Sequence, residues 1–189
     1  MNRYISDTHF FHENANRFDK SPFANEELRR ETMILNWNNY TNDDDDVYIL
    51  GDMFWRGHEA EAIAIMKRLK GRKHLILGNH DRVQGKIRFE FADVQERANI
   101  TDNGRHVVLS HFPEMFYNRQ HYGAIMLYGH VHNTIEQDFL VKWQEELRNA
   151  GIPCNVINVG CMQPYMNYTP RTLDEILAAY PFFPPQNRK

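Results

Sequence analysis

The chain has 189 residues, and its 22 lysines and arginines against 25 aspartates and glutamates give a formal net charge of −3. This length predicts one domain that buries enough surface to fold without disulfides, and the slight acidic excess argues against a protein that holds nucleic acid mainly through phosphates, so we do not expect stable nucleic-acid binding. No apolar run is long enough to span a membrane and no signal peptide is visible, so we expect a cytoplasmic protein that does not bind membranes.

Strand-like and helix-like segments alternate in the first half of the chain. The expected strands cover residues 3–6, 47–50 and 74–77, and the expected helices cover residues 25–40 and 58–70. The second helix has apolar residues at helical spacing and ends at Gly71 after basic residues. Four consecutive aspartates, residues 43–46, are typical of a solvated loop, and because adjacent side chains point to different sides they would make a poor metal site.

The second half continues the alternation. Strands are expected at residues 94–100, 106–109, 124–128 and 155–159, with a hairpin turn at Asp102-Asn-Gly104. A helix is expected at 136–150, and Thr172 with Glu175 forms a capping box that begins another. Because apolar strands are separated by helices, we predict a layered α/β fold, with residues 1–189 forming a single domain and residues 181–189 a loose tail.

One pattern recurs at the strand ends: an apolar strand runs into a small residue, and a polar side chain follows. The cases are Ser6-Asp7-Thr-His9, Gly51-Asp52, Gly78-Asn79-His80-Asp81, Ser110-His111 and Gly129-His130-Val-His132. Ligands of α/β sheets bind at the carboxyl ends of strands, so these side chains are expected to meet at one edge. Such a set has too many ligands for one ion and suits two ions that share a carboxylate. The alternative is a set of separate structural histidines.

The same blocks, in the same order, resemble the motif of the calcineurin-like metallophosphoesterase superfamily, and in particular its small single-domain bacterial and phage-type members. The match extends from Asp7 to His132, and the strand at 155–159 resembles the closing strand of that family. The resemblance implies an α/β/β/α sandwich of two mixed sheets flanked by helices. It also implies a metal-dependent phosphoric ester hydrolase that acts on small phosphate esters, with phosphodiesters, including nucleotide-like ones, preferred over monoesters.

The resemblance further implies two divalent transition-metal ions. One ion would be held by Asp7, His9, Asp52 and His132, and the other by Asp52, Asn79, His111 and His130. Oxygen and imidazole ligands suit Mn, Fe, Zn, Co or Ni, and the ligand types do not choose among these metals. A hydroxide held between the ions would attack phosphorus in line. His80 would act as general acid, and Asp81 would orient its imidazole.

The second block departs from related Ser/Thr phosphatases, in which an aspartate stands where this chain has Trp55. A protein-phosphatase activity is therefore not expected. Arg56 keeps the place of a phosphate-binding arginine, so it is a candidate catalytic or substrate-binding residue, with an ordinary surface arginine as the alternative. His12 follows the first block and is a candidate substrate contact. Residues 112–122 could stack on a nucleobase or simply pack over the site.

Two other functions are compatible with the same residues. A metal-dependent nuclease is one, although the charge balance argues against it. A non-enzymatic scaffold is the other, but such relatives typically lose ligands or the acid histidine, and this chain keeps all of them.

Overall fold

The computed structural model describes residues 1–181, so the predicted tail at 181–189 lies outside the described residues apart from Pro181. Its strands form two four-stranded sheets. The first is parallel throughout, in the order β1 (Asn2–Ile5), β2 (Asp46–Ile49), β3 (Arg72–Ile76) and β4 (Asp93–Gln95). The second has the order β5 (Arg97–Asp102), β6 (Arg105–Ser110), β7 (Ile125–Tyr128) and β8 (Val156–Asn158), and only its β5–β6 pair is antiparallel.

Helices connect and cover the strands. They are α1 (Ala15–Phe18), α2 (Glu26–Tyr40), α3 (Glu59–Arg68), α4 (Ile135–Asn149) and α5 (Leu173–Ala179), with 3₁₀ turns η1 (Gly85–Glu90) and η2 (Gln120–Tyr122). The long helices begin where the sequence predicts. The Asn25 side chain accepts a hydrogen bond from the Leu28 amide, and Thr172 and Glu175 form the expected capping box.

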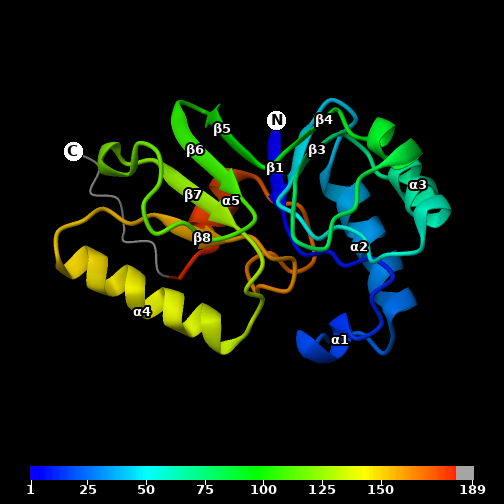
Figure 1. Cartoon of the computed structure of the whole chain (residues 1–189), viewed down its shortest axis with the longest axis horizontal. Helices are drawn as coiled ribbons and strands as arrows, with labels where there is room; N and C mark the ends of the chain where they lie inside the picture. The colour runs from blue at the N-terminus through cyan, green and yellow to red at the C-terminus, as the bar shows by residue number, and fades with distance from the viewer. Residues whose placement is uncertain (182–189) are drawn as a thin grey trace.

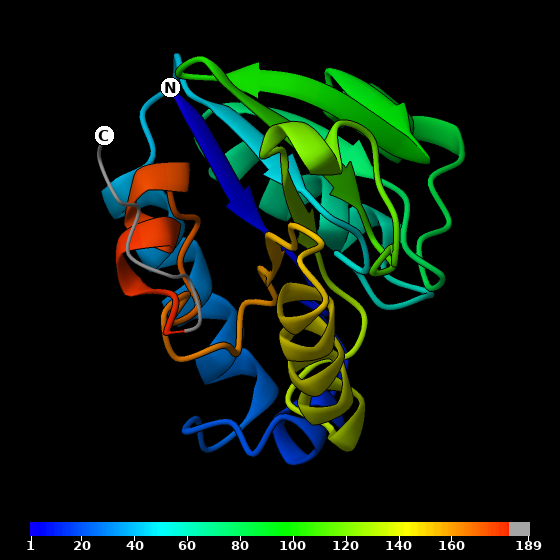
Figure 2. The same ribbon diagram turned by 90° about the vertical axis from the view of Figure 1, so that its left-hand side faces the viewer.

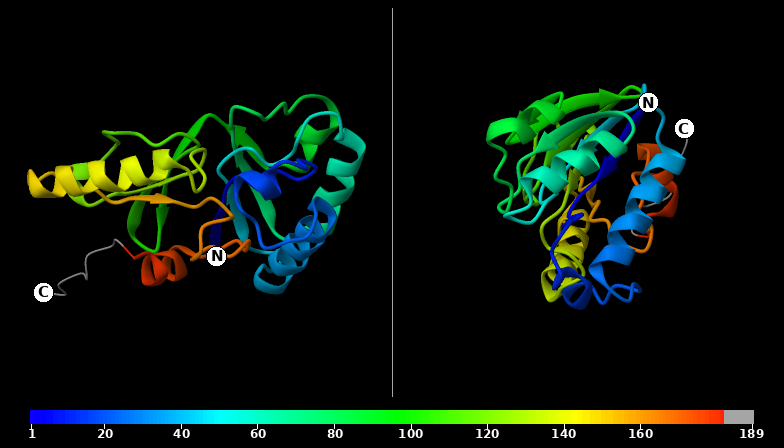
Figure 3. Two further views of the ribbon diagram at one scale, coloured as in Figure 1. Left: turned by 90° about the horizontal axis from the view of Figure 1, so that it is seen from below. Right: turned by 90° about the vertical axis from the view of Figure 1, so that its right-hand side faces the viewer.

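Three apolar cores separate the layers. The first lies between the parallel sheet and α2 and α3, and includes Trp37, Ile49 and Met66. The second lies between the two sheets, with α5 packed against it, and the third lies between the second sheet and α4. Figure 1 shows α2 and α3 at one end and α4 at the other, Figure 2 views the molecule from the end that carries α4, and Figure 3 shows the strands between these helices. The expected α/β/β/α sandwich is confirmed, with its mixed pairing confined to the second sheet.

Two sequence-based expectations need correction. The strand expected at 94–100 breaks at Glu96 into β4 and β5, which belong to different sheets, so this short segment carries the chain from one layer to the other. The four aspartates are not a solvated loop throughout. Asp45 is buried and accepts a hydrogen bond from Arg3, and Asp46 begins β2 and pairs with Arg72.

The two sheets meet at the carboxyl ends of β1 and β8. The Ser6 amide donates to the Val159 carbonyl, and the Cys161 amide donates to the Ser6 carbonyl. This junction brings the strand ends of both sheets to one edge, where the recurring polar residues lie. No helix within residues 1–181 is both long and apolar enough to cross a membrane. The single domain and the cytoplasmic location stay predictions.

Candidate metal centre

The polar residues after the strands adopt an unusual backbone conformation. Five candidate ligands have left-handed φ angles: Asp7 (55°), His9 (43°), Asp52 (54°), His130 (72°) and His132 (51°). This region is costly for residues other than glycine, and such strain persists where the surrounding structure enforces it, often at functional sites. The loops after β1, β2 and β7 therefore turn their side chains toward a common edge at an energetic cost.

Two glycines give these side chains room. A Cβ at Gly78 would overlap the Asp52 carboxylate, and a Cβ at Gly129 would overlap Ser6 and the Asp7 carboxylate. Gly78 and Gly129 are thus space requirements, since each lets the end of one strand approach the carboxylate that follows another.

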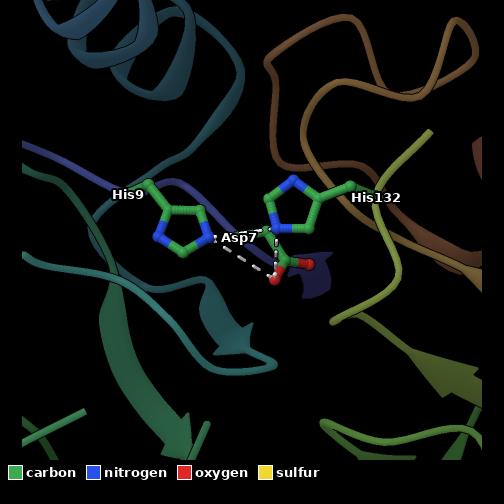
Figure 4. Close-up of side chains that lie close together, drawn as sticks. All are labelled: Asp7, His9 and His132. Carbon is green, nitrogen blue, oxygen red and sulfur yellow. Dashed lines mark hydrogen bonds and ion pairs between the residues drawn. The ribbon is translucent and has the colours of Figure 1, made fainter. Parts of the chain in front are cut away.

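The first cluster consists of Asp7, His9 and His132, which come from the loops after β1 and β7. The Nε2 atoms of His9 and His132 lie 3.1 Å apart, and they lie 3.9 Å and 3.7 Å from Oδ1 of Asp7. Figure 4 shows both rings facing the Asp7 carboxylate. Two imidazole nitrogens and a carboxylate oxygen converge, as in a metal site.

The second cluster consists of Asp7, Asp52 and His111, joined by Asn79. Nδ1 of His111 donates to the Leu50 carbonyl at 2.7 Å, so in the neutral ring Nε2 carries only a lone pair. That lone pair faces Oδ1 of Asn79 at 3.0 Å and Oδ2 of Asp52 at 3.5 Å. With this orientation of the Asn79 amide, three lone pairs converge, and these residues fit a divalent ion.

Burial disfavours the charged forms of both the carboxylate and the imidazole at this site. It raises the pKa of Asp7, although His132 and His111 oppose this, and burial also lowers the pKa of His9. A buried carboxylate beside neutral imidazoles is costly unless a cation compensates it. The donor set thus fits divalent metals that accept oxygen and imidazole ligands, as expected, and Asp7 belongs to both clusters.

The structure does not bring His130 into either cluster. Its ring packs 4.4 Å from the ring of Phe112 and 5.2 Å from that of His111, while its amide donates to the Asp7 carboxylate. The role of His130 as a ligand, and that of Asp52 as the bridge, stay predictions.

His80 lies at the edge of the second cluster. Its Nε2 is 3.9 Å from Oδ2 of Asp52, and its side chain is 34% exposed, against 6% for His9 and 1% for His111. Of the three imidazoles that face this oxygen, His80 is the one open to solvent.

The expected role of Asp81 is wrong. Its carboxylate does not bond to the imidazole of His80, whose Nδ1 has no partner among the described residues. Instead it accepts hydrogen bonds from the amides of Asp52 and Gly78 at 2.9 Å and 2.8 Å, and from Met53 at 3.1 Å. These amides lie in the loops that follow β2 and β3 and occupy both carboxylate oxygens. Asp81 therefore positions Asp52 rather than His80.

Two positioning residues were missed by sequence reasoning. Asp19 is buried at the end of α1 and accepts a hydrogen bond from Nδ1 of His132, and Arg29 donates to the His9 carbonyl at 2.6 Å. Burial alone lowers the pKa of His132, but the hydrogen bond to Asp19 and the charge of Asp7 raise it overall. Neither residue belongs to a motif, so only the tertiary fold reveals them.

The substrate candidates surround His80. The Arg56 side chain is exposed, and Arg56 and His80 line the same cavity. His12 does not line this cavity but lies next to Trp55, with its ring 3.8 Å from the Trp55 ring. In the segment 112–122, Tyr117 is buried and bonded to Ala124, whereas Phe116 and Tyr122 are exposed. Tyr117 bonds at the amino ends of β7 and β8, away from the site, and Phe112 is the residue of this segment whose ring packs on His111 and His130.

Comparison with known proteins gives one family. A model of the calcineurin-like phosphoesterase family matches residues 4–157. The chain is 32% identical over 175 residues to an uncharacterized protein of Methanocaldococcus jannaschii, a match that covers 92% of this chain and 87% of that one. It is also 32% identical over 126 residues to the gene 66 protein of Mycobacterium phage D29, covering 52% and 63%.

The fold agrees with a solved structure, that of a protein of unknown function from Aquifex aeolicus. The TM-score is 0.68 at 25% identity, and the match covers 93% of this chain and 97% of that one. The likeness of fold thus extends over almost the whole chain.

Proposed function

We propose a substrate class for this chain, which belongs to the calcineurin-like phosphoesterase family. It hydrolyses small phosphodiesters, including nucleotide-like ones, in preference to monoesters. Family membership makes it a metal-dependent phosphoester hydrolase in general terms. The substrate preference and the roles of the residues are our inference from the site.

One observation carries this proposal. Oδ2 of Asp52 faces the Nε2 atoms of three histidines, at 3.5 Å from His111 and 3.9 Å from His9 and His80. Two of these imidazoles are buried and suit metal binding, whereas His80 is partly exposed and can meet a substrate. One carboxylate thus faces both the imidazoles that suit metal binding and the imidazole that a substrate can reach, and this arrangement supports a phosphoester hydrolase.

The residues divide into ligands and substrate groups. Asp7, His9, Asp52 and His132 would hold one ion, and Asp52, Asn79, His111 and His130 the other. When bound, two divalent ions activate water and neutralise phosphoryl charge. The ligands combine oxygen and imidazole, which suits Mn, Fe, Zn, Co and Ni alike, and manganese is the first ion we would test.

His80 acts on the leaving group. An alcohol leaves a diester readily only if its oxygen receives a proton, and Nε2 of His80 supplies it. Arg56 contacts a phosphoryl oxygen, for which its planar guanidinium is suited, and His12 contacts the substrate from the opposite side of Trp55.

A substrate panel tests the proposal. The protein loaded with Mn, Ni, Zn or Mg would be assayed with an aryl phosphodiester, an aryl monoester, cyclic nucleotides and single-stranded DNA. We expect the diester to be hydrolysed faster than the monoester and the DNA to remain intact. Cleavage of DNA would instead indicate a nuclease, and no turnover by the folded, metal-loaded protein would indicate a scaffold.

A further inference from the structure

A cavity of about 460 Å³ opens beside His80. It is lined by residues 54–59, 62, 80–85, 87 and 91. None of the seven candidate metal ligands is among these residues, so the cavity extends away from the metal clusters. Its volume lies in the range of small-molecule pockets.

The walls of the cavity are largely apolar and aromatic, and its charged lining residues are of both signs. Ile87 and Phe91 are buried in the first core, and the ring of Trp55 lies 5.1 Å from that of His80. Arg56 and Arg82 line the same cavity with exposed side chains. Such a lining favours a flat ring over a small polar group, because rings pack on aromatic faces and guanidinium planes.

The cavity is also braced. Oε1 of Glu59, on α3, accepts hydrogen bonds from the amides of Lys86 and Ile87 at 3.1 Å and 3.4 Å. These bonds fix the position of η1 relative to α3, and both segments contribute lining residues, so the wall that they form is in place before any ligand arrives. A preformed pocket loses less entropy on binding.

The position of His80 indicates which part of the substrate the cavity would hold. Nε2 of His80 faces Asp52, and the His80 side chain also lines the cavity. A group that takes a proton from His80 is therefore the group next to the cavity. In a phosphoester reaction that group is the departing alcohol.

We propose that this cavity is the leaving-group pocket and that it takes an alcohol with an aromatic ring. The inference rests on the proposed function. In the reaction, the oxygen of water bonds to phosphorus and the P–O bond to the alcohol breaks. The electron pair of that bond stays on the alcohol oxygen, which takes the proton of His80, and the ring of the alcohol lies against Trp55. One proton of the water stays with the phosphate product, and the other is released to solvent, from which His80 is reprotonated for the next turnover. Aryl-substituted alcohols and nucleosides share this chemistry.

The kinetic test compares alcohols of similar acidity. Release of benzyl alcohol from methyl benzyl phosphate is measured against release of ethanol from methyl ethyl phosphate, and thymidine release from its 5′-methyl phosphate separates nucleosides from simple aryl alcohols. Two variants fill the cavity, Val83→Trp and Gln84→Trp, and Gln84 is exposed, so its replacement spares the core. The control is Val141→Trp, which fills a separate cavity beside α4.

We expect both cavity-filling variants to lower kcat/KM for the benzyl diester by about tenfold or more, while the ethyl diester changes less than about twofold. The control should leave both values unchanged. Equal losses for both diesters, or no loss for either, would overturn the proposal. If only the benzyl or only the thymidine ester is affected, the pocket is specific for that source of the ring.

A binding measurement separates this proposal from the proposed function. Saturation-transfer NMR with benzyl alcohol and metal-free protein needs no catalysis. We expect a signal with the wild type and with Val141→Trp, and loss of the signal with Val83→Trp. Binding without hydrolysis would retain the pocket and refute the proposed activity, whereas hydrolysis with no binding would refute the pocket alone.

Discussion

Oδ1 of Asp19 accepts a hydrogen bond of 2.6 Å from Nδ1 of His132, and this bond turns Nε2 of His132 toward Asp7 and His9. A carboxylate behind an imidazole fixes its tautomer and makes it a better metal ligand.

We therefore expect Asp19→Asn to weaken metal binding by about 10- to 100-fold. The affinity for Mn is measured by titration calorimetry. The matched control is Asp93→Asn, because Asp93 bonds to Nδ1 of His74 in the same way, at 2.8 Å, outside the metal clusters. Equal affinities in the Asp19 variant and the wild type would show that this pair does not support the site.

Asp81 ties the ends of two strands together through three backbone amides. Asp81→Asn places an amide group against these donors, so we expect the free energy of unfolding to fall by about 2–3 kcal/mol, as for hydrogen bonds to charged groups. Urea denaturation measures it. Asp174→Asn breaks an exposed ion pair with Arg105 and should cost less than about 1 kcal/mol. Similar losses in the two variants would refute the positioning role.

His80 belongs to neither metal cluster within the described residues. His80→Asn should therefore lower kcat by about 10²–10⁴ and leave the metal content unchanged. Steady-state kinetics and elemental analysis measure the two effects, and His121→Asn, at an exposed position, is the control. Unchanged activity would rule out a general-acid role, and loss of metal would make His80 a ligand.

Protonation of Asp46 makes the free energy of unfolding depend on pH. The hydrogen bond from Arg72 lowers the pKa of Asp46 from 3.8 to about 2. The hydrogen bond from His74 adds to this shift, and burial opposes it. The group stabilises the fold above pH 3.8, and this contribution is lost as the pH falls toward about 2. In Asp46→Asn the unfolding free energy should depend less on pH in this window, as measured by urea denaturation. Parallel curves would contradict this assignment, and high salt should reduce the difference because Arg72 is exposed.

Sequence reasoning located the site because its residues are local to strand ends. The pairs Asp7 with His9 and His130 with His132 follow apolar strands, and the family motif supplied their order. The structure brings Asp7 together with His9 and His132 in one cluster and with Asp52 and His111 in the other, as this pattern indicates. The order of the strands in the sheets and the helix α1 could not be predicted from the sequence. For α1 the reason is that a four-residue helix has almost no periodic signal.

What the sequence could not reveal depends on contacts between distant segments. Asp19 and His132 are 113 residues apart, and Arg3 and Asp45 are 42 apart. The four aspartates have the composition of a solvated loop, yet Asp45 has a buried cationic partner that only pairing of β1 with β2 brings close. The role of Asp81 was misjudged because neighbours in sequence, His80 and Asp81, point to different partners.

The central claim is that this edge holds two ions, with Asp52 shared between them. Elemental analysis of the protein after saturation with Mn and removal of unbound metal tests it most directly, on the wild type and on Asp52→Asn. We predict two ions per chain in the wild type and fewer than one in the variant, because both sites lose a charged ligand. Two ions retained by Asp52→Asn would contradict the shared carboxylate, and a wild type that binds none would contradict the metal centre itself.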